Sequence, residues 1–481
     1  MQYVAKTSLD PFFTPRRIAL VGASEQGMYP AGILRNLLNY GFDGQLYPVN
    51  PRRDTVFGLP AYPDVTQTPQ PPDLAVLTVP RRAVLPVLRQ CVQAGVRAAS
   101  VITAGFAEAD EEGRRLQAEM AAFLHDKPLR VLGPNCAGNA NIPGRVIAAR
   151  LPAPPLPGPV SFVSQSGALM MALYGLFHDR RLGLDRLLSL GNQVDVSLAD
   201  SLSYLACAPE TTAIGAFVEG LDDGAAFVAA LGDLLRAGKP LALVKSGRTA
   251  AGGQAAATHT AALTGSNRVF EAVCRQFGVA LVDDVGDMVD TLQLFAAFGP
   301  HLRGAQRLAI VTQSGGLGSL SADLAQTAGL DLPAYGETVQ GRLRQLPFLL
   351  TFGDLGNPAD VRGEPVIAQN TIATLAPFME DPHTGAVLLL LAKSAVSEQA
   401  AETAQAIVTV ARQFEKPLLV VWTGQRQPVG EIQWRPAATI LDEAGVPLFD
   451  QPSNCIGALS RAVAYWRFRE AWLADDEGDH A

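Results

Sequence analysis

Residues 162–169, FVSQSGAL, and residues 310–318, IVTQSGGLG, are two versions of one pattern. In each, an apolar run typical of a buried strand leads into the four-residue sequence Ser/Thr-Gln-Ser-Gly. A stretch that suits a helix follows. Three further matches occur in the same order after both copies: GNQVD at 191–195 with GNPAD at 356–360, KPLALVKSGR at 239–248 with KPLLVVWTGQ at 416–425, and FGVALVDD at 277–284 with AGVPLFDQ at 444–451. This order predicts two copies of one α/β unit.

Upstream of the repeat, short apolar or β-branched runs alternate with amphipathic stretches. The runs are Ile18–Val21, Leu46–Val49, Leu74–Val79, Ala98–Thr103 and Leu129–Leu132. Such alternation is typical of a doubly wound parallel sheet. The proline-rich stretch 150–160 is expected to be a stiff linker that closes this first domain. The whole chain is therefore expected to be of the α/β class.

Composition excludes several kinds of protein. The 481 residues are 48% hydrophobic and 17% charged, with a net charge of −8 and no basic run, which argues against a nucleic-acid partner. The five cysteines are scattered, with no CxxC pair, which argues against a disulfide framework and a zinc site. No signal-peptide core is present, and the longest apolar run, residues 386–392, is too short to cross a membrane. We expect a soluble cytoplasmic protein without membrane contact.

The ends of the five expected strands carry small or polar residues. They are Gly22, Ala23 and Ser24; Asn50 and Pro51; Val79 and Pro80; Thr103, Ala104 and Gly105; and Asn135 and Cys136. Each turn alone is compatible with ordinary turn chemistry, but ligands of such sheets bind where these strands end, so five on one edge favour a nucleotide-type ligand. A dehydrogenase is disfavoured, because the glycine fingerprint is incomplete and Asn50 stands where an acidic residue is needed.

Residues 245–266, KSGRTAAGGQAAATHTAALTGS, are rich in Gly, Ala, Ser and Thr and contain one histidine, His259. On its own, the stretch fits a functional loop and an incidental flexible loop equally well. The second copy has no histidine in the corresponding place. Neutral imidazole is a good nucleophile near pH 7, whereas a zinc site would need further ligands at metal-binding spacing. We therefore expect no metal site, and consider His259 a candidate phosphoryl acceptor.

The two repeated turns could stabilise a phosphoryl group. Their residues are Ser164, Gln165, Ser166 and Gly167 in the first copy, and Gln313, Ser314, Gly315 and Gly316 in the second. A helix that begins there offers unpaired N–H groups and a dipole worth about 0.3–1 kcal/mol to an anion. Simple helix capping explains either turn alone. Their duplication in a chain with one candidate phosphohistidine favours phosphate binding.

Taken together, these motifs resemble the NDP-forming acyl-CoA synthetase family, relatives of succinyl-CoA synthetase. The resemblance begins at LDPFFTPRRIALVGAS from Leu9 and covers nearly the whole chain, through PVNP, TAGFAE, GPNCAG, SQSGAL, SLGNQVDVSLADSLSYL, VEG, KSGRT, THTAALTGS, TQSGGLG, GNPADV and GVPLFDQP. It implies a Rossmann-like CoA-binding domain over 1–150, followed by two flavodoxin-like domains of the succinyl-CoA synthetase type over 158–298 and 305–470.

The resemblance also implies a reaction. A carboxylic acid, CoA and ATP are interconverted with acyl-CoA, ADP and phosphate through a phosphohistidine. By motif match His259 would be that histidine, and Glu219 of Val-Glu-Gly would position it or stabilise its phosphorylated form. The strand-end turns would hold CoA, with Asn135 and Cys136 near its thiol, although Cys136 need not be a nucleophile.

The sequence departs from the family pattern at two points. The family's SHTGALAGS is THTAALTGS here, with Ala261 and Thr264 at the altered small positions. The family also needs an ATP-grasp domain of about 200 residues, which the three expected domains leave no room for. We therefore expect the α subunit of a heterotetramer, in which an ATP-grasp β subunit binds ATP/ADP and Mg. The alternatives are a catalytically inactive regulatory protein that binds CoA or acyl-CoA, and a protein acyltransferase subunit, though no segment could hold the latter's acetyltransferase domain.

Overall fold

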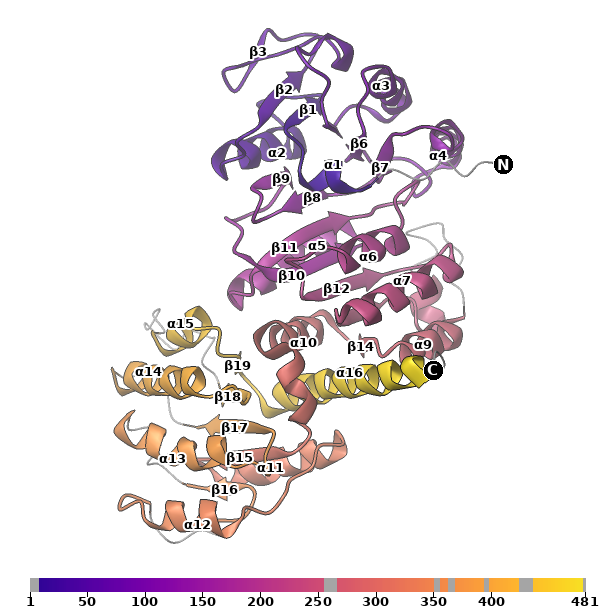
Figure 1. Cartoon of the computed structure of the whole chain (residues 1–481). Coiled ribbons are helices and arrows are strands. Elements are labelled where there is room, and N and C mark those ends of the chain that lie inside the picture. Colours follow the sequence, from indigo (N-terminus) through magenta and orange to yellow (C-terminus); the bar gives the residue numbers. More distant parts are fainter. Residues whose placement is uncertain are drawn as a thin grey trace. The chain divides into compact units, whose positions relative to one another are not determined.

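The computed structural model describes residues 8–254, 266–349, 355–361, 368–392, 398–423 and 436–478 (Figure 1). The chain forms two compact units, residues 1–285 and 286–481. The first unit contains two large sheets and the second contains one.

The first sheet of the first unit has the strand order β2-β1-β5-β6-β7, and all its pairs are parallel. Its strands are β1 Arg17–Val21, β2 Gln45–Val49, β5 Leu74–Leu77, β6 Ala98–Val101 and β7 Arg130–Leu132. The connecting helices are α2 Met28–Asn39, α3 Arg81–Gln93 and α4 Glu111–Leu124. Because both sheet faces are covered, β5 and β6 are buried at every position, as the continuous apolar sequence of β5 predicts. The one polar residue of β6, Ser100, donates its hydroxyl to Asn139 Oδ1 at 2.7 Å. The predicted doubly wound sheet is confirmed.

The second sheet has the order β14-β13-β12-β10-β11-β8-β9. Its parallel strands are β10 Pro157–Ser164, β11 Leu184–Ser189, β12 Ala213–Val218, β13 Leu241–Lys245 and β14 Ala280–Val282. The helices around it are α5 Gly167–Asp179, α6 Leu198–Ala206, α7 Gly224–Ala237 and α9 Asn267–Gln276. The antiparallel hairpin of β8 Gly138–Asn141 and β9 Val146–Ala149 extends this sheet through β11.

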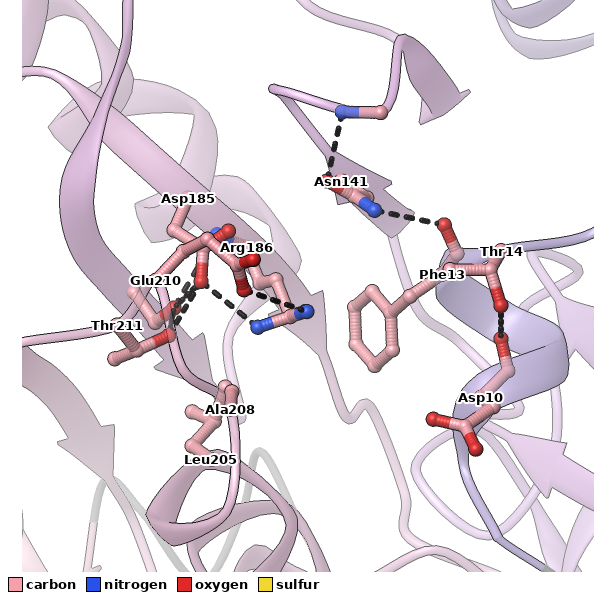
Figure 2. A network of polar contacts seen from close by, with 12 residues as sticks. Asp10, Phe13, Thr14, Asn141, Asp185, Arg186, Leu205, Ala208, Glu210 and Thr211 are labelled. Atoms are coloured by element: carbon pink, nitrogen blue, oxygen red, sulfur yellow. Dashed lines mark hydrogen bonds and ion pairs between the residues drawn. The ribbon is translucent and has the colours of Figure 1, made fainter.

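A short N-terminal helix, α1 Asp10–Phe13, is fixed against the second sheet (Figure 2). Asn141 of β8 donates its side-chain N–H to the carbonyl of Phe13 at 2.9 Å. The Phe13 ring stacks on Tyr204 at 5.1 Å, and the Arg186 guanidinium lies 5.5 Å from the Phe13 centroid. Arg186 is itself paired with buried Asp185 at 2.8 Å. A buried cation therefore sits beneath the aromatic pair that anchors the helix.

The sheet of the second unit has the order β16-β15-β17-β18-β19 and is parallel throughout. Its strands are β15 Leu308–Thr312, β16 Ala359–Asp360, β17 Ala386–Leu391, β18 Leu418–Trp422 and β19 Leu448–Phe449. Its helices are α10 Val285–Phe298, α11 Gly315–Thr327, α12 Glu337–Arg344, α13 Ala368–Glu380, α14 Glu398–Gln413, α15 Pro436–Glu443 and α16 Pro452–Gly478, with the 3-10 helix Gly299–Gly304 after α10. Among the described residues, no helix is both long and apolar enough to cross a membrane.

The predicted repeat is confirmed by this topology. Read from β19 to β16, the sheet has the same strand order as β14 to β11 of the second sheet. The lysines that precede the equivalent strands also bind alike: Lys239 donates to the carbonyls of Leu205 and Ala208, and Lys416 to those of Phe378 and Asp381. In both cases a lysine satisfies carbonyls at or just beyond a helix C-terminus. The domain limits expected from the sequence remain predictions.

Candidate functional site

The five predicted strand-end turns all lie at the carboxyl edge of the first sheet, because its strands are parallel. The first two turns are built together. The N–H groups of Gly22 and Ala23 donate to the carbonyl of Val49 at 3.0 and 3.2 Å, and the Asn50 side chain donates to the carbonyl of Ala23 at 2.8 Å. Asn50 thus fixes the path of the first turn, with Ser24 partly exposed beside it.

The third and fourth turns are joined in the same way. Thr103 donates its hydroxyl to the carbonyl of Val79 at 2.6 Å, and the exposed residues Pro80 and Ala104 flank this bond. The carbonyl of Gly105 accepts from Arg81 at 3.0 Å. Arg81 also pairs with two carboxylates, Asp110 at 2.9 Å and Glu112 at 2.7 Å. Its charge is therefore balanced within the fold.

Glu108 is the central acceptor of the fourth turn. One carboxylate oxygen accepts from the N–H of Gly105 at 2.6 Å and the other from Asn192 Nδ2 at 2.6 Å. Burial acts to raise the pKa of Glu108, but the hydrogen bonds from Asn192 and the main-chain N–H groups of Gly105 and Phe106 outweigh it, so the pKa lies below its ordinary value. Glu108 is therefore an ionised carboxylate that joins the first sheet to the second.

The fifth turn lies where the two sheets of the first unit meet. Asn135 is partly exposed and donates to Asn192 Oδ1 at 3.3 Å. Gly191 has a φ of +56°, and a Cβ there would lie 2.2 Å from the carbonyl oxygen of Pro134. Only glycine fits this approach. The turn after β7 and the turn after β11 therefore form one surface.

Cys136 is unsuited to nucleophilic chemistry. Its thiol is buried and donates to the carbonyl of Val101 at 3.3 Å. Burial raises the pKa of Cys136 to about 12. Since the thiolate is the nucleophilic form, this cysteine acts as a packed core residue.

The first predicted phosphate-binding turn adjoins this surface. Ser164 donates to the carbonyl of Ser166, and Ser166 Oγ accepts from the N–H of Leu169 at 3.3 Å, which caps α5. A Cβ on Gly167 would lie 3.1 Å from the Cβ of Ala137 and 3.3 Å from its nitrogen. The start of α5 therefore touches the residue directly after Cys136, so the turn expected to hold the CoA thiol and the turn expected to hold phosphate are in contact.

Glu219 lies one residue beyond the end of β12 and is buried. Its N–H donates to Gln165 Oε1, which also accepts from the N–H of Gly220 at 3.0 Å. Gln165 Nε2 in turn donates to the carbonyl of Gly220 at 2.8 Å. The Gln165 side chain thus fixes the main chain at Glu219, and it places this residue at the same sheet edge as the Ser164–Gly167 turn.

The second predicted turn has the same construction within its own unit. Thr312 donates to the carbonyl of Ser314, and Ser314 Oγ accepts from the N–H of Leu317 at 3.4 Å. Gln313 Oε1 accepts from the N–H of Ala392 at 3.3 Å. Gly315 and Gly316 are exposed at the start of α11. This turn lies in the second unit, whereas the first turn lies in the first unit.

His259 lies outside the described residues, as do Ala261 and Thr264. The described chain stops at Gln254 and resumes at Ser266, which precedes α9. In the described ranges, no group of three or more His, Cys, Asp or Glu side chains could hold a metal ion.

The structure adds three residues that the sequence did not single out, namely Glu108, Asn192 and Lys245. Glu108 and Asn192 are 84 positions apart, so no local pattern indicates their contact. Lys245 opens the Gly/Ala-rich stretch, but only the structure shows that its ammonium group donates to the carbonyl of Glu219 at 2.7 Å.

Comparison with known proteins agrees with this organisation. Residues 16–141 match the model of the CoA binding domain, and residues 157–295 match that of the succinyl-CoA ligase like flavodoxin domain. A solved structure of dinucleotide-forming acetyl-coenzyme A synthetase 1 from Candidatus Korarchaeum cryptofilum, in complex with phosphate and ADP, superposes with a TM-score of 0.88 at 31% identity. This match covers 97% of this chain and 99% of that one.

Two relatives differ in length. The α subunit of ADP-forming acetate–CoA ligase I from Pyrococcus furiosus is 31% identical, over 95% of this chain and 98% of its own. The ADP-forming 4-hydroxybutyrate–CoA ligase of Nitrosopumilus maritimus is 30% identical, over 97% of this chain but only 65% of its own. The chain belongs to the NDP-forming acyl-CoA synthetase family, in which it is similar to α subunits of ADP-forming acid–CoA ligases over nearly its whole length.

Proposed function

We propose that this chain is the α subunit of an acid–CoA ligase that interconverts a small carboxylic acid, CoA and ATP with acyl-CoA, ADP and phosphate. The observation that supports it most is the contact between Gly167 and Ala137. It brings the fifth strand-end turn, proposed for the CoA thiol, against the start of α5, proposed for phosphate. Thioester and phosphate oxygen would then meet without a large movement within the first unit.

In the direction that consumes acyl-CoA, the proposed reaction has two steps on this chain. A phosphate oxygen attacks the thioester carbonyl, the C–S bond breaks, and CoA leaves with a proton as the thiol. The imidazole of His259 then attacks phosphorus, and the P–O bond to the carboxylate breaks. The N–H groups at the start of α5 would stabilise the phosphoryl charge, and Glu219 would orient the imidazole.

The nucleotide step is proposed for a separate ATP-grasp subunit that binds ATP/ADP and Mg, with two copies of each subunit in the complex. Support comes from two relatives that are named as α subunits and of which the chain covers 98% and 96%. The Mg-nucleotide would supply the phosphoryl group in the synthetic direction. The three-domain division 1–150, 158–298 and 305–470 belongs to the same proposal.

The test uses the purified full chain with acetyl-CoA and 32P-phosphate. We expect an acid-labile, base-stable label that His259→Ala abolishes. We also expect no acyl-CoA from acid, ATP and CoA until an ATP-grasp partner is added. Turnover by the chain alone would contradict the split-subunit proposal, and CoA binding without any label would favour a regulatory protein instead.

A further inference from the structure

The ammonium group of Lys245 lies at the end of β13, beside the end of β12. Nζ donates to the carbonyl of Glu219 at 2.7 Å and to the carbonyl of Ser246. It also lies 5.8 Å from the centroid of Phe270. Within the described ranges, both hydrogen-bond acceptors of Lys245 are uncharged main-chain carbonyls. Neither of these two carbonyls neutralises the charge of the ammonium group.

The main chain of Glu219 is therefore held from two sides. Gln165 Oε1 accepts from its N–H, and Lys245 Nζ donates to its carbonyl. The ladder between β12 and β13 ends with the pair Val218 and Lys245, so Glu219 has left the sheet. The two side chains replace the ladder hydrogen bonds that this residue would otherwise make.

A hydrogen bond to the carbonyl of Glu219 does not require a positively charged donor. A neutral amide could donate to a carbonyl at a lower desolvation cost than a half-buried ammonium group. Burial lowers the pKa of Lys245, and the nearby Glu219 carboxylate opposes that shift. The Glu219 carboxylate is thus close enough to interact with the ammonium charge.

The second copy of the unit provides an internal comparison. The pair Leu391 and Trp422 occupies the ladder position of Val218 and Lys245. Ala392 therefore corresponds to Glu219, and the buried Trp422 corresponds to Lys245. Gln313 keeps the same bond to the N–H of Ala392 that Gln165 makes to Glu219. The glutamine is thus common to both copies, whereas the lysine is present only in the copy that has the glutamate.

We infer that Lys245 is a positioning residue for the phosphoryl-transfer site. It fixes the main chain of Glu219, and its charge orients the Glu219 carboxylate for its proposed role beside the phosphohistidine. The inference rests on the proposed roles of Glu219 and His259. It adds a cation to the Ser164–Gly167 edge, where an incoming phosphate dianion would otherwise meet the Glu219 carboxylate alone.

The experiment compares Lys245→Met, Lys245→Arg and Lys239→Met in the full chain. Lys239 is the matched control: it precedes the same strand, its pKa is also lowered by burial, and it too donates to two main-chain carbonyls. The readout is the rate of acid-labile labelling from acetyl-CoA and 32P-phosphate over a range of phosphate concentrations, with the Tm of each variant.

We expect Lys245→Met to slow labelling about 10- to 100-fold, the loss typical when a group that orients an active-site residue is removed. Lys245→Arg should recover part of the rate, because it keeps the charge. Lys239→Met should lower Tm and label like the wild type. Equal rates for Lys245→Met and wild type, or equal losses in Lys245→Met and Lys239→Met, would overturn the inference. Failure of the proposed function would give a different result from failure of this inference, because labelling would then be unaffected by His259→Ala.

Discussion

The carboxylate of Asp195 accepts from Arg130 Nε at 2.9 Å and from the N–H of Val131 at 2.8 Å. Asp195 follows β11 of the second sheet, whereas Arg130 and Val131 begin β7 of the first. The two side chains are only 6% and 11% exposed, for Arg130 and Asp195 respectively. A buried ion pair therefore joins the sheets below the edge where their turns meet, and it holds the candidate site together.

Removing one partner of this pair should be costly. Asp195→Asn removes the nearer of two carboxylates beside the buried Arg130 guanidinium, since Asp200 stays at 3.5 Å, and we expect a loss of about 1–3 kcal/mol in the free energy of unfolding. Asp233→Asn is the control, because its pair with Arg236 is exposed and should contribute less than about 1 kcal/mol. Urea titration followed by far-UV circular dichroism measures both. Equal small losses would show that the pair does not join the sheets.

Gly191→Ala should disturb the site and the fold together. The left-handed φ alone costs about 1 kcal/mol for alanine, and the 2.2 Å approach to the Pro134 carbonyl adds a clash. Gly95→Ala separates the two effects, since Gly95 has a φ of +78° with no atom within 4 Å of an added Cβ. We expect a clearly larger drop in Tm for Gly191→Ala. Similar drops would indicate that only the backbone conformation matters.

Much of this edge could be predicted from the sequence. Strand β5 is a continuous apolar run and β6 is apolar apart from Ser100. Each is followed by turn residues, so the parallel order and the position of turns such as Thr103–Gly105 followed from local pattern. The repeat also predicted that the Gln165 and Gln313 turns would be alike, and their hydrogen bonds agree.

What the sequence could not indicate depends on contacts between distant elements. Glu108 is recognisable as a turn residue, but its bond to Asn192 requires knowing that the second sheet lies against the first. Cys136 follows a predicted strand end like any exposed turn residue, yet it is buried, because the turn folds back over β6. Side-chain burial at such junctions is decided by tertiary packing, which local pattern does not encode.

The five cysteines should differ sharply in reactivity. Cys207 is exposed, whereas Cys91, Cys136, Cys274 and Cys455 are buried. Burial raises the pKa of Cys91, Cys136 and Cys274 to about 12 each. We therefore expect a disulfide reagent at pH 8 to modify one thiol quickly in the native chain and five after denaturation.

Cys136→Ala should retain most of the labelling activity, and a loss as large as that of His259→Ala would contradict the structural role assigned to Cys136.

The contribution of the ionised Glu108 carboxylate to folding stability should depend on pH. Its folded pKa is below the ordinary value of 4.5, so its stabilisation is fully present above pH 4.5 and is lost as the pH falls through the lower folded pKa. Glu108→Gln replaces a charged acceptor and should cost about 1.5–3 kcal/mol at pH 7. The difference in unfolding free energy between wild type and variant should shrink below pH 4.5.

Glu111→Gln provides the matched control, because Glu111 is 85% exposed and pairs only with its neighbour Arg114 among the described residues. A difference between wild type and Glu108→Gln that stays constant from pH 7 to pH 3 would mean that the carboxylate charge does not hold the fourth turn against Asn192.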